Sequence, residues 1–257
     1  MGPICTALLM ALLLLHPMQA AAQALSINQT PYDEAVNILD LRPITFEDVA
    51  ERRLDPILQR EGVTVGGWLS GQTVQIKAGM HHENHTVLNR RKPDLPLRLD
   101  ARSGPIRGAV VFDGAFGSYA LAGIGPAQMP GRSPLGTGIL TLLFDEPQCL
   151  VGFRTWLDPH RFGVFPMQFP EGNLNLIFWN RDGQAMVEFW RFKDFGAQAY
   201  AFIQSSGSEP QITALTIQNL DPEGIGVDDL LLSPLCPYLV GQRLPPGFRL
   251  SSASGRG

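Results

Sequence analysis

Short runs of alternating apolar and polar residues recur between residues 44 and 234. In one run, Leu174, Leu176 and Phe178 share a side and Asn175 lies on the other. A period of two places successive side chains on opposite faces, as a half-buried strand requires. The pattern predicts strands at 72–78, 95–101, 108–112, 138–144, 149–157, 174–180, 185–192, 199–204, 212–219 and 227–232.

Gly, Pro, Asn and Asp separate these runs and predict turns. Residues 180–183, Asn-Arg-Asp-Gly, lie between two apolar runs and indicate a hairpin, while the acidic, proline-containing stretch 145–147 is predicted to end a strand. Many short strands with turns between them are typical of an all-β sandwich or barrel. We expect long loops at 80–96 and 124–136.

The segment 45–62 departs from this period. Its apolar residues are spaced almost as in a helix, and Thr45 is suited to cap one, but Pro56 would interrupt it. We predict a strand at 44–46, followed by a short helix or an irregular turn.

The N-terminal segment resembles an export signal. Residues 1–24 contain no charged side chain, and the apolar run 7–15 is followed by small residues with A-x-A-like sites, so cleavage after Ala22 or Ala24 fits. We predict a signal peptide at 1–24, a lead-in segment at 25–43, one domain at 44–234 and a disordered tail at 235–257. The mature protein is then secreted or periplasmic and has no membrane span.

Charge and cysteine content narrow the partners and the compartment. The net charge of -4 argues against a nucleic-acid partner, which normally meets a basic stripe. Cys149 and Cys236 are the two cysteines that follow the signal segment. In an oxidising compartment such a pair predicts a disulfide, and two buried free thiols are the alternative.

Three short motifs, taken in order, carry a family resemblance. They are Ile-Thr-Phe-Glu at 44–47, Leu-Phe-Asp-Glu-Pro-Gln-Cys-Leu-Val-Gly-Phe at 143–153 and Gly-Val-Asp-Asp-Leu at 226–230. The chain resembles the exported bacterial jelly-roll domains of proteins with PEP-CTERM sorting tails and, more distantly, MAM and laminin-G domains. The resemblance implies a two-sheet antiparallel jelly-roll sandwich. The tail lacks a Pro-Glu-Pro sequence and an apolar span, so we expect free release.

The resemblance also implies a structural calcium ion that joins the first and last strands. Its ligands would be Glu47 and Asp228 or Asp229, since carboxylate oxygens suit calcium and a buried carboxylate needs a partner. Capped turns and salt bridges to nearby arginines are the alternative. His82 and His85 are one residue short of the helical H-E-x-x-H zinc spacing. His81 and His85 have the spacing, but their segment lacks an apolar face, and we interpret the three histidines as part of a solvated loop.

Aromatic residues in the middle strands suggest a ligand surface. Sugar-binding sandwiches stack pyranose rings on exposed aromatic side chains. Trp179, at a strand end before a hairpin turn, is the first surface candidate and Trp156 the second; core packing is the alternative for both.

We therefore predict a secreted, non-catalytic β-sandwich module that binds a glycan or a cell-surface partner. A jelly-roll polysaccharide hydrolase or lyase is the alternative, with Asp158, Glu171 and Glu188 as candidate carboxylates. A structural matrix component is a third possibility.

Overall fold

The computed structural model describes much of the chain between residues 27 and 236. The described ranges are 27–49, 52–54, 57–78, 84–101, 107–126, 134–157, 174–191, 196–204, 209–219 and 224–236. The predicted signal peptide, residues 1–24, and most of the predicted tail therefore lie outside the described residues. No helix in these ranges has the length and apolar character to cross a membrane.

The described elements are one helix and fifteen strands. They are β1 (Ile27–Pro31), α1 (Tyr32–Leu39), β2 (Arg52–Leu54), β3 (Leu58–Arg60), β4 (Val63–Gly66), β5 (Thr73–Ala78), β6 (Asn84–Arg90), β7 (Gly108–Asp113), β8 (Ser118–Gly123), β9 (Ile139–Gln148), β10 (Leu150–Leu157), β11 (Leu174–Trp179), β12 (Ala185–Arg191), β13 (Gly196–Gln204), β14 (Ile212–Asn219) and β15 (Val227–Ser233).

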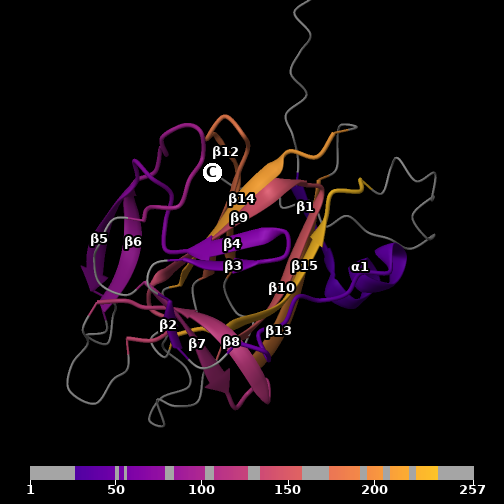
Figure 1. Cartoon of the computed structure of the whole chain (residues 1–257), viewed down its shortest axis with the longest axis horizontal. Coiled ribbons are helices and arrows are strands. Elements are labelled where there is room, and N and C mark those ends of the chain that lie inside the picture. The colour runs from indigo at the N-terminus through magenta and orange to yellow at the C-terminus, as the bar shows by residue number, and fades with distance from the viewer. Residues whose placement is uncertain are drawn as a thin grey trace, which may run out of the picture.

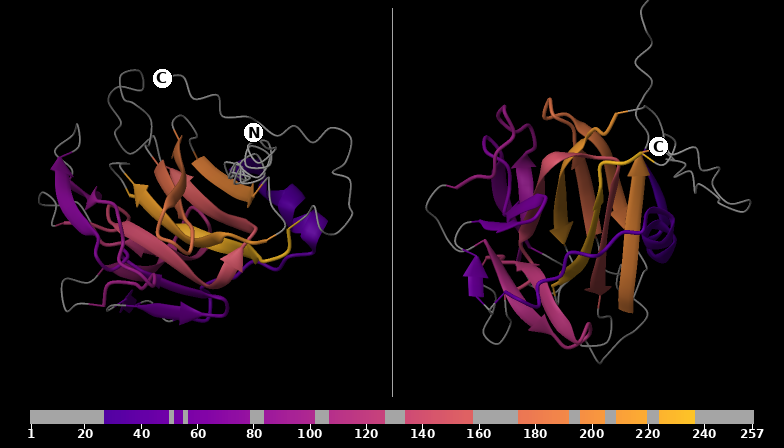
Figure 2. Two further views of the ribbon diagram at one scale, coloured as in Figure 1. Left: turned by 90° about the horizontal axis from the view of Figure 1, so that it is seen from above. Right: turned by 45° about the vertical axis from the view of Figure 1, so that its right-hand side comes forward.

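Two antiparallel sheets pack face to face (Figures 1 and 2). A seven-stranded sheet has the order β1-β13-β10-β15-β8-β7-β2, and a six-stranded sheet has the order β12-β11-β14-β9-β4-β3. The prediction of an all-β, two-sheet, jelly-roll-like sandwich is confirmed.

Apolar side chains from the inner faces of both sheets form the main core. The ring of Phe202 on β13 lies 5.1 Å, between centroids, from Phe178 on β11 and from Phe189 on β12. Tilted aromatic pairs of this kind add about 0.5–1.5 kcal/mol beyond the area they bury. These contacts therefore help to hold the two sheets together.

A third layer covers part of the outer face of the six-stranded sheet. It consists of the β5–β6 hairpin and the following residues 91–100, and it encloses a second core that includes Leu69, Leu99 and Ile177. The long loop predicted at 80–96 is thus wrong for 84–90, which form β6. The strand predicted at 95–101 is also wrong, since only Leu99 makes a bridge there, to Leu69.

Helix α1 covers part of the opposite side of the molecule (Figure 1). Tyr32 and Ala35 pack on the outer face of the seven-stranded sheet, against Leu150, Ala201 and Leu231. Before the helix, β1 pairs with β13 along its length. The segment 25–43, expected as a lead-in, therefore contributes an edge strand and a helix to the sandwich.

The segment 45–62 and the stretch 145–147 differ from expectation. After a bridge between Ile44 and Leu230, the chain forms a turn at 47–49, as the irregular-turn alternative predicted. The short strands β2 and β3, which were not predicted, follow it. Strand β9 continues through 145–147 to Gln148, so no turn ends it there. The turn at 180–183 is confirmed: the Asn180 side chain accepts backbone hydrogen bonds from Asp182 and Gln184, and Gly183 has a φ of 67°.

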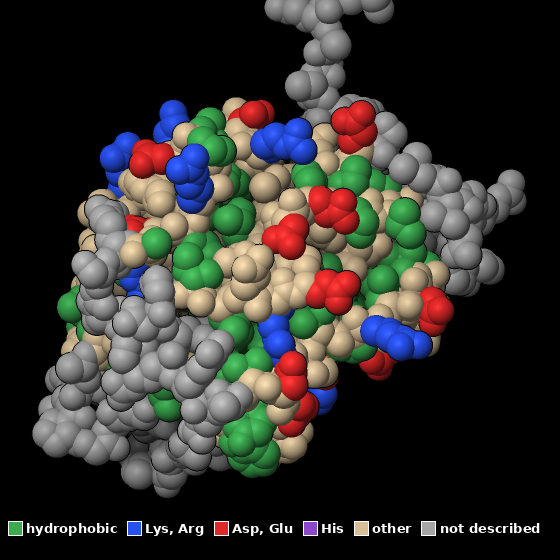
Figure 3. Space-filling model, viewed as in Figure 1, with side chains coloured by type: hydrophobic (Ala, Val, Ile, Leu, Met, Phe, Trp, Pro, Cys, Tyr) green, Lys and Arg blue, Asp and Glu red, His purple; other side chains and the backbone are tan. Residues whose placement is uncertain are grey.

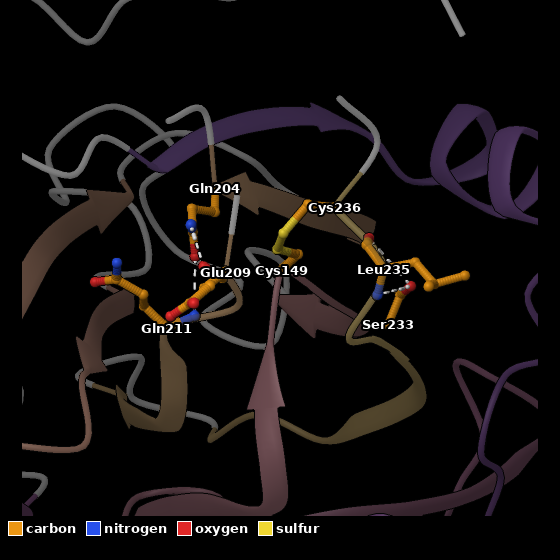
Figure 4. Close-up of a disulfide and its surroundings, with 7 residues drawn as sticks. All are labelled: Cys149, Gln204, Glu209, Gln211, Ser233, Leu235 and Cys236. Atoms are coloured by element: carbon orange, nitrogen blue, oxygen red, sulfur yellow. Dashed lines mark hydrogen bonds between the residues drawn. A yellow bond between two sulfur atoms is a disulfide. The ribbon is translucent and has the colours of Figure 1, made fainter. Parts of the chain in front are cut away.

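A disulfide joins Cys149 to Cys236, whose Cα atoms are 5.1 Å apart (Figure 4). Cys149 precedes β10, and its backbone N–H donates to the carbonyl of Ser233 at the end of β15. Cys236, which the predicted boundaries place in the tail, is buried. The bridge thus fastens the C-terminal end of the last strand to the middle of the seven-stranded sheet.

Candidate functional site

Trp179, the first surface candidate, is buried, with 1% of its side chain exposed. Its Nε1 donates to Thr216 Oγ1 at 2.9 Å, and its ring belongs to the core beneath the third layer. The expectation of a surface position was wrong because β5, β6 and residues 91–100 cover this face of β11. Every side chain of β11 is buried, including Asn175, which the alternation pattern had placed toward solvent.

Trp156, the second candidate, lies on the outer face of the seven-stranded sheet and is partly exposed. Val151 and Phe153 on β10 point into the core, so alternation places Arg154 and Trp156 on the outer face. On the neighbouring strand β13, Trp156 pairs with Ala197, which is exposed and too small to cover the indole ring. Part of an aromatic face is therefore accessible beside Arg154.

A β-bulge brings an acidic partner to Arg154. The register of β10 and β15 shifts between Gly152 and Arg154, and Asp229 has a φ of 50°, in the left-handed region. Asp229 Oδ2 then accepts a hydrogen bond from Arg154 Nη1 at 2.8 Å, and its carbonyl accepts one from the Tyr32 hydroxyl at 2.7 Å. The hydrogen bond to Asp229 raises the pKa of Arg154, while burial beside Asp229 raises the pKa of Tyr32.

The β7–β8 turn supplies a second aromatic ring. Asp113 Oδ1 accepts a hydrogen bond from the backbone N–H of Ala115 and shapes this turn. The centroid of the Phe116 ring lies 5.6 Å from the guanidinium carbon of Arg154. Gly226 permits the approach, since a Cβ there would lie 2.9 Å from Asp113 Oδ2 and 3.3 Å from Phe116 Cε2. We call Trp156, Arg154, Asp229, Phe116 and Asp113 the β10 face.

Asp228 lies beneath this face and has an unsatisfied oxygen. Its side chain is 2% exposed, Oδ2 accepts a hydrogen bond from Ser118 Oγ at 2.7 Å, and Oδ1 has no hydrogen-bond partner. Burial raises the pKa of Asp228, hydrogen bonding from Ser118 and from the Asp229 backbone lowers it in part, and the charges of Asp229 and Glu47 raise it further. The surroundings of Asp228 therefore favour its protonated form more than water does.

The three predicted calcium ligands differ in their placement. Glu47 lies three residues after Ile44, which bridges to β15, and its charge raises the pKa of Asp228. Its Oε1 accepts a hydrogen bond from the backbone N–H of Tyr119 at 3.0 Å. Asp229 forms a salt bridge with Arg154, the kind of contact that was the alternative to calcium. Within the described ranges, no group of three or more His, Cys, Asp or Glu side chains is arranged to hold a metal.

The remaining candidates are the three carboxylates of the hydrolase alternative and the three histidines. Glu188 accepts hydrogen bonds from Arg91 at 2.5 Å and from Asn175 at 2.7 Å, whereas Asp158 and Glu171 lie outside the described residues. His81 and His82 also lie outside them. His85, interpreted as part of a solvated loop, is instead buried on β6.

Sequence reasoning did not single out Arg154, Phe116, Asp113 or Ser118. The sequence alone could have indicated Arg154, because it precedes Trp156 by two residues in a predicted strand and so shares its face. Phe116 and Asp113 reach the site only through the packing of the β7–β8 turn on Gly226, which no local pattern marks.

No protein-family model matches the chain, and no curated protein resembles it significantly in sequence. The resemblance to PEP-CTERM-associated, MAM and laminin-G domains therefore stays a prediction.

Similar solved structures include CBM28, a carbohydrate-binding module specific for non-crystalline cellulose. It is 17% identical with a TM-score of 0.29, and the match covers 49% of this chain and 80% of the module. A Stig cyclase from Fischerella sp. TAU is 16% identical with a TM-score of 0.28, over 76% of this chain and 98% of the cyclase.

The enzymatically active domain of bacteriophage CBA120 tailspike protein 4 is 10% identical with a TM-score of 0.25. That match covers 82% of this chain and 19% of the tailspike chain. Scores of this size carry no inference about function, and the fold is assigned from the sheets described above.

Proposed function

We propose that the chain is an exported, non-catalytic binding module that holds a glycan, or another cell-surface partner, against the β10 face. The observation that carries the proposal is the partly exposed indole of Trp156 beside the Arg154–Asp229 ion pair. A pyranose ring has an apolar face that stacks on an indole, and its hydroxyl groups can exchange hydrogen bonds with a guanidinium and a carboxylate. An aromatic surface with a few fixed polar groups is a common form of ligand site.

Replacing Trp156 with alanine is expected to weaken glycan binding about tenfold or more, because a stacked aromatic anchor commonly contributes over 1 kcal/mol. The measurement begins with a glycan-array screen of the wild-type protein. Titration calorimetry of both proteins with the glycan that binds then gives the affinities.

Phe112→Ala is the matched control, since Phe112 is 56% exposed and packs edge-on against Tyr119. It lies on β7, which β15 and β8 separate from β10 in the same sheet. This variant should bind as the wild type does. Equal affinity of the Trp156→Ala and wild-type proteins would refute the placement of the site. Turnover of any polysaccharide in the same screen would support the hydrolase or lyase alternative instead.

We further propose that Asp228 and Glu47 hold a structural calcium ion, with the Ser118 hydroxyl beside it. The buried, unsatisfied Oδ1 of Asp228 supports this, because an ionised carboxylate there needs a positive partner. Without a cation, the raised pKa of Asp228 favours its protonated form as the pH falls. The contribution of Asp228 to stability is then present at acidic pH and is lost as the pH rises through its folded pKa.

The Asp228→Asn variant separates the two cases. In calcium at 100 times the Kd, the wild type should gain about 2.7 kcal/mol and exceed the variant in stability. In EDTA at pH 7 the variant should be as stable as the wild type or more stable. Its asparagine can still accept the hydrogen bond from Ser118 and carries no buried charge.

Thermal unfolding of both proteins with calcium and with EDTA, between pH 4 and 8, tests this. Asp145→Asn, at an exposed position, is the control. A wild-type melting temperature that does not respond to calcium would refute the cation, while leaving the glycan proposal untouched.

A further inference from the structure

Four exposed cationic side chains lie on two chain segments far from the β10 face. Arg90, Lys92 and Arg98 belong to the end of β6 and the loop after it, and Arg181 belongs to the β11–β12 turn. Within the part of the chain that the structure describes, none of the four forms an ion pair. We call these four residues the cationic patch.

The two segments are in contact. Gly183 of the β11–β12 turn faces the loop, and a Cβ there would lie 3.1 Å from Pro93 Cγ and 3.3 Å from Leu95 Cδ2. Figure 1 shows the loop after β6 beside the turn that precedes β12. In the same orientation, Figure 3 shows several Lys and Arg side chains in this upper part of the molecule, with Asp and Glu side chains among them and further Asp and Glu side chains in the middle of the face.

The backbone beneath the patch is firmly held. The buried Gln72 side chain donates to the carbonyl of Arg91 at 2.7 Å, and Ser70 accepts from the backbone of Asp94 and donates to the carbonyl of Arg98. Arg91 itself is directed to Glu188 on β12. A binding surface that is already ordered loses less entropy when its ligand arrives.

The charge of the patch contrasts with that of the whole chain. Its four cations are accompanied on the same two segments by Asp94 and Asp182, while the complete protein has a net charge of -4. An extended anionic surface such as a membrane would meet the acidic remainder as well. A single anionic polymer strand can contact the patch alone, because charges more than about 10 Å away are screened at moderate salt.

We propose that the cationic patch is a second binding site, which takes an anionic polysaccharide bearing carboxylate or sulfate groups. Three of its four cations are arginines, whose planar guanidinium groups donate paired hydrogen bonds to such oxyanions. The site is independent of the β10 face and of the calcium proposal. It would let the module hold a charged polymer on one side while Trp156 contacts a sugar on another.

The test is titration of the full-length protein with polygalacturonate, with dextran sulfate and with neutral dextran. The wild type should bind one or both anionic polymers, with affinity falling as salt rises, and should not bind neutral dextran. The variant Arg90→Gln/Lys92→Gln/Arg98→Gln/Arg181→Gln should bind about tenfold more weakly or worse. Binding of polygalacturonate alone would identify carboxylate as the ligand chemistry, and binding of dextran sulfate alone would identify sulfate.

Two control proteins make the result specific. Arg42→Gln/Lys77→Gln removes two exposed cations outside the patch and should bind as the wild type does. Trp156→Ala should keep its affinity for the anionic polymers, so that failure of the β10-face proposal is distinguishable from failure of this one. Equal affinity of the patch variant and the wild type would overturn the proposal, as would tighter binding to phosphatidylglycerol vesicles than to either polymer.

Discussion

Replacing Trp179 with alanine is expected to lower the free energy of unfolding by about 3–5 kcal/mol, the range for removing a buried large aromatic side chain. The indole is 1% exposed and fills the core between the six-stranded sheet and the third layer. Its loss would leave a cavity and would also remove the hydrogen bond to Thr216. Urea unfolding, followed by far-UV circular dichroism, measures the change.

The controls separate packing from ligand contact. Trp179→Phe keeps an aromatic ring but loses the hydrogen bond, so its cost should be smaller than that of alanine. Trp156→Ala, at a partly exposed position, should cost about 1 kcal/mol or less. A Trp179→Ala protein of nearly wild-type stability that no longer binds glycan would restore the surface interpretation and contradict the packing described here.

The case of Trp179 shows where sequence patterns stop. Alternation correctly placed Leu176 and Phe178 in the main core and therefore put Trp179 on the opposite face. Whether that face is open depends on β6 and residues 91–100, which are more than 70 positions earlier in the chain. The polar composition of 80–96 indicated a loop, although Leu88 in that stretch helps to close the second core.

The prediction for 45–62 missed strands β2 and β3 for a different reason. Strands β2 and β3 have three residues each, too short for alternation to be recognised. Two such strands with a break between them gave an apolar spacing close to a helical one. Pairing with β7 and β4 decides their structure, and pairing is not a local property.

The candidate site was predictable in part. The segment 44–46 was expected to lie beside the last strand, and the bridge between Ile44 and Leu230 confirms this and brings Glu47 near Asp228. The bulge could not be foreseen, because a one-residue shift in register leaves no composition signal. That shift turns Asp229 toward Arg154, with which it forms an ion pair.

Removing the disulfide is the second change with a large expected effect. The bridge closes a loop with a sequence separation of 87 residues and therefore restricts the unfolded chain strongly. Loop-closure entropy for this length is about 4–5 kcal/mol, and measured losses for native bridges fall at about 2–5 kcal/mol. The Cys149→Ala/Cys236→Ala protein should lose stability within the measured range, as determined by urea unfolding.

Reduction provides the matched comparison, because wild-type protein unfolded in excess dithiothreitol has the same unbridged unfolded state. The reduced wild type and the double variant should agree to within about 1 kcal/mol, since both cysteines are almost completely buried and alanine removes little more than the sulfur atoms. The dependence of unfolding free energy on urea should also become steeper in both, because an unbridged chain exposes more surface. A double variant as stable as the oxidised wild type would show that the packing of β10 and β15 alone secures this end of the sandwich.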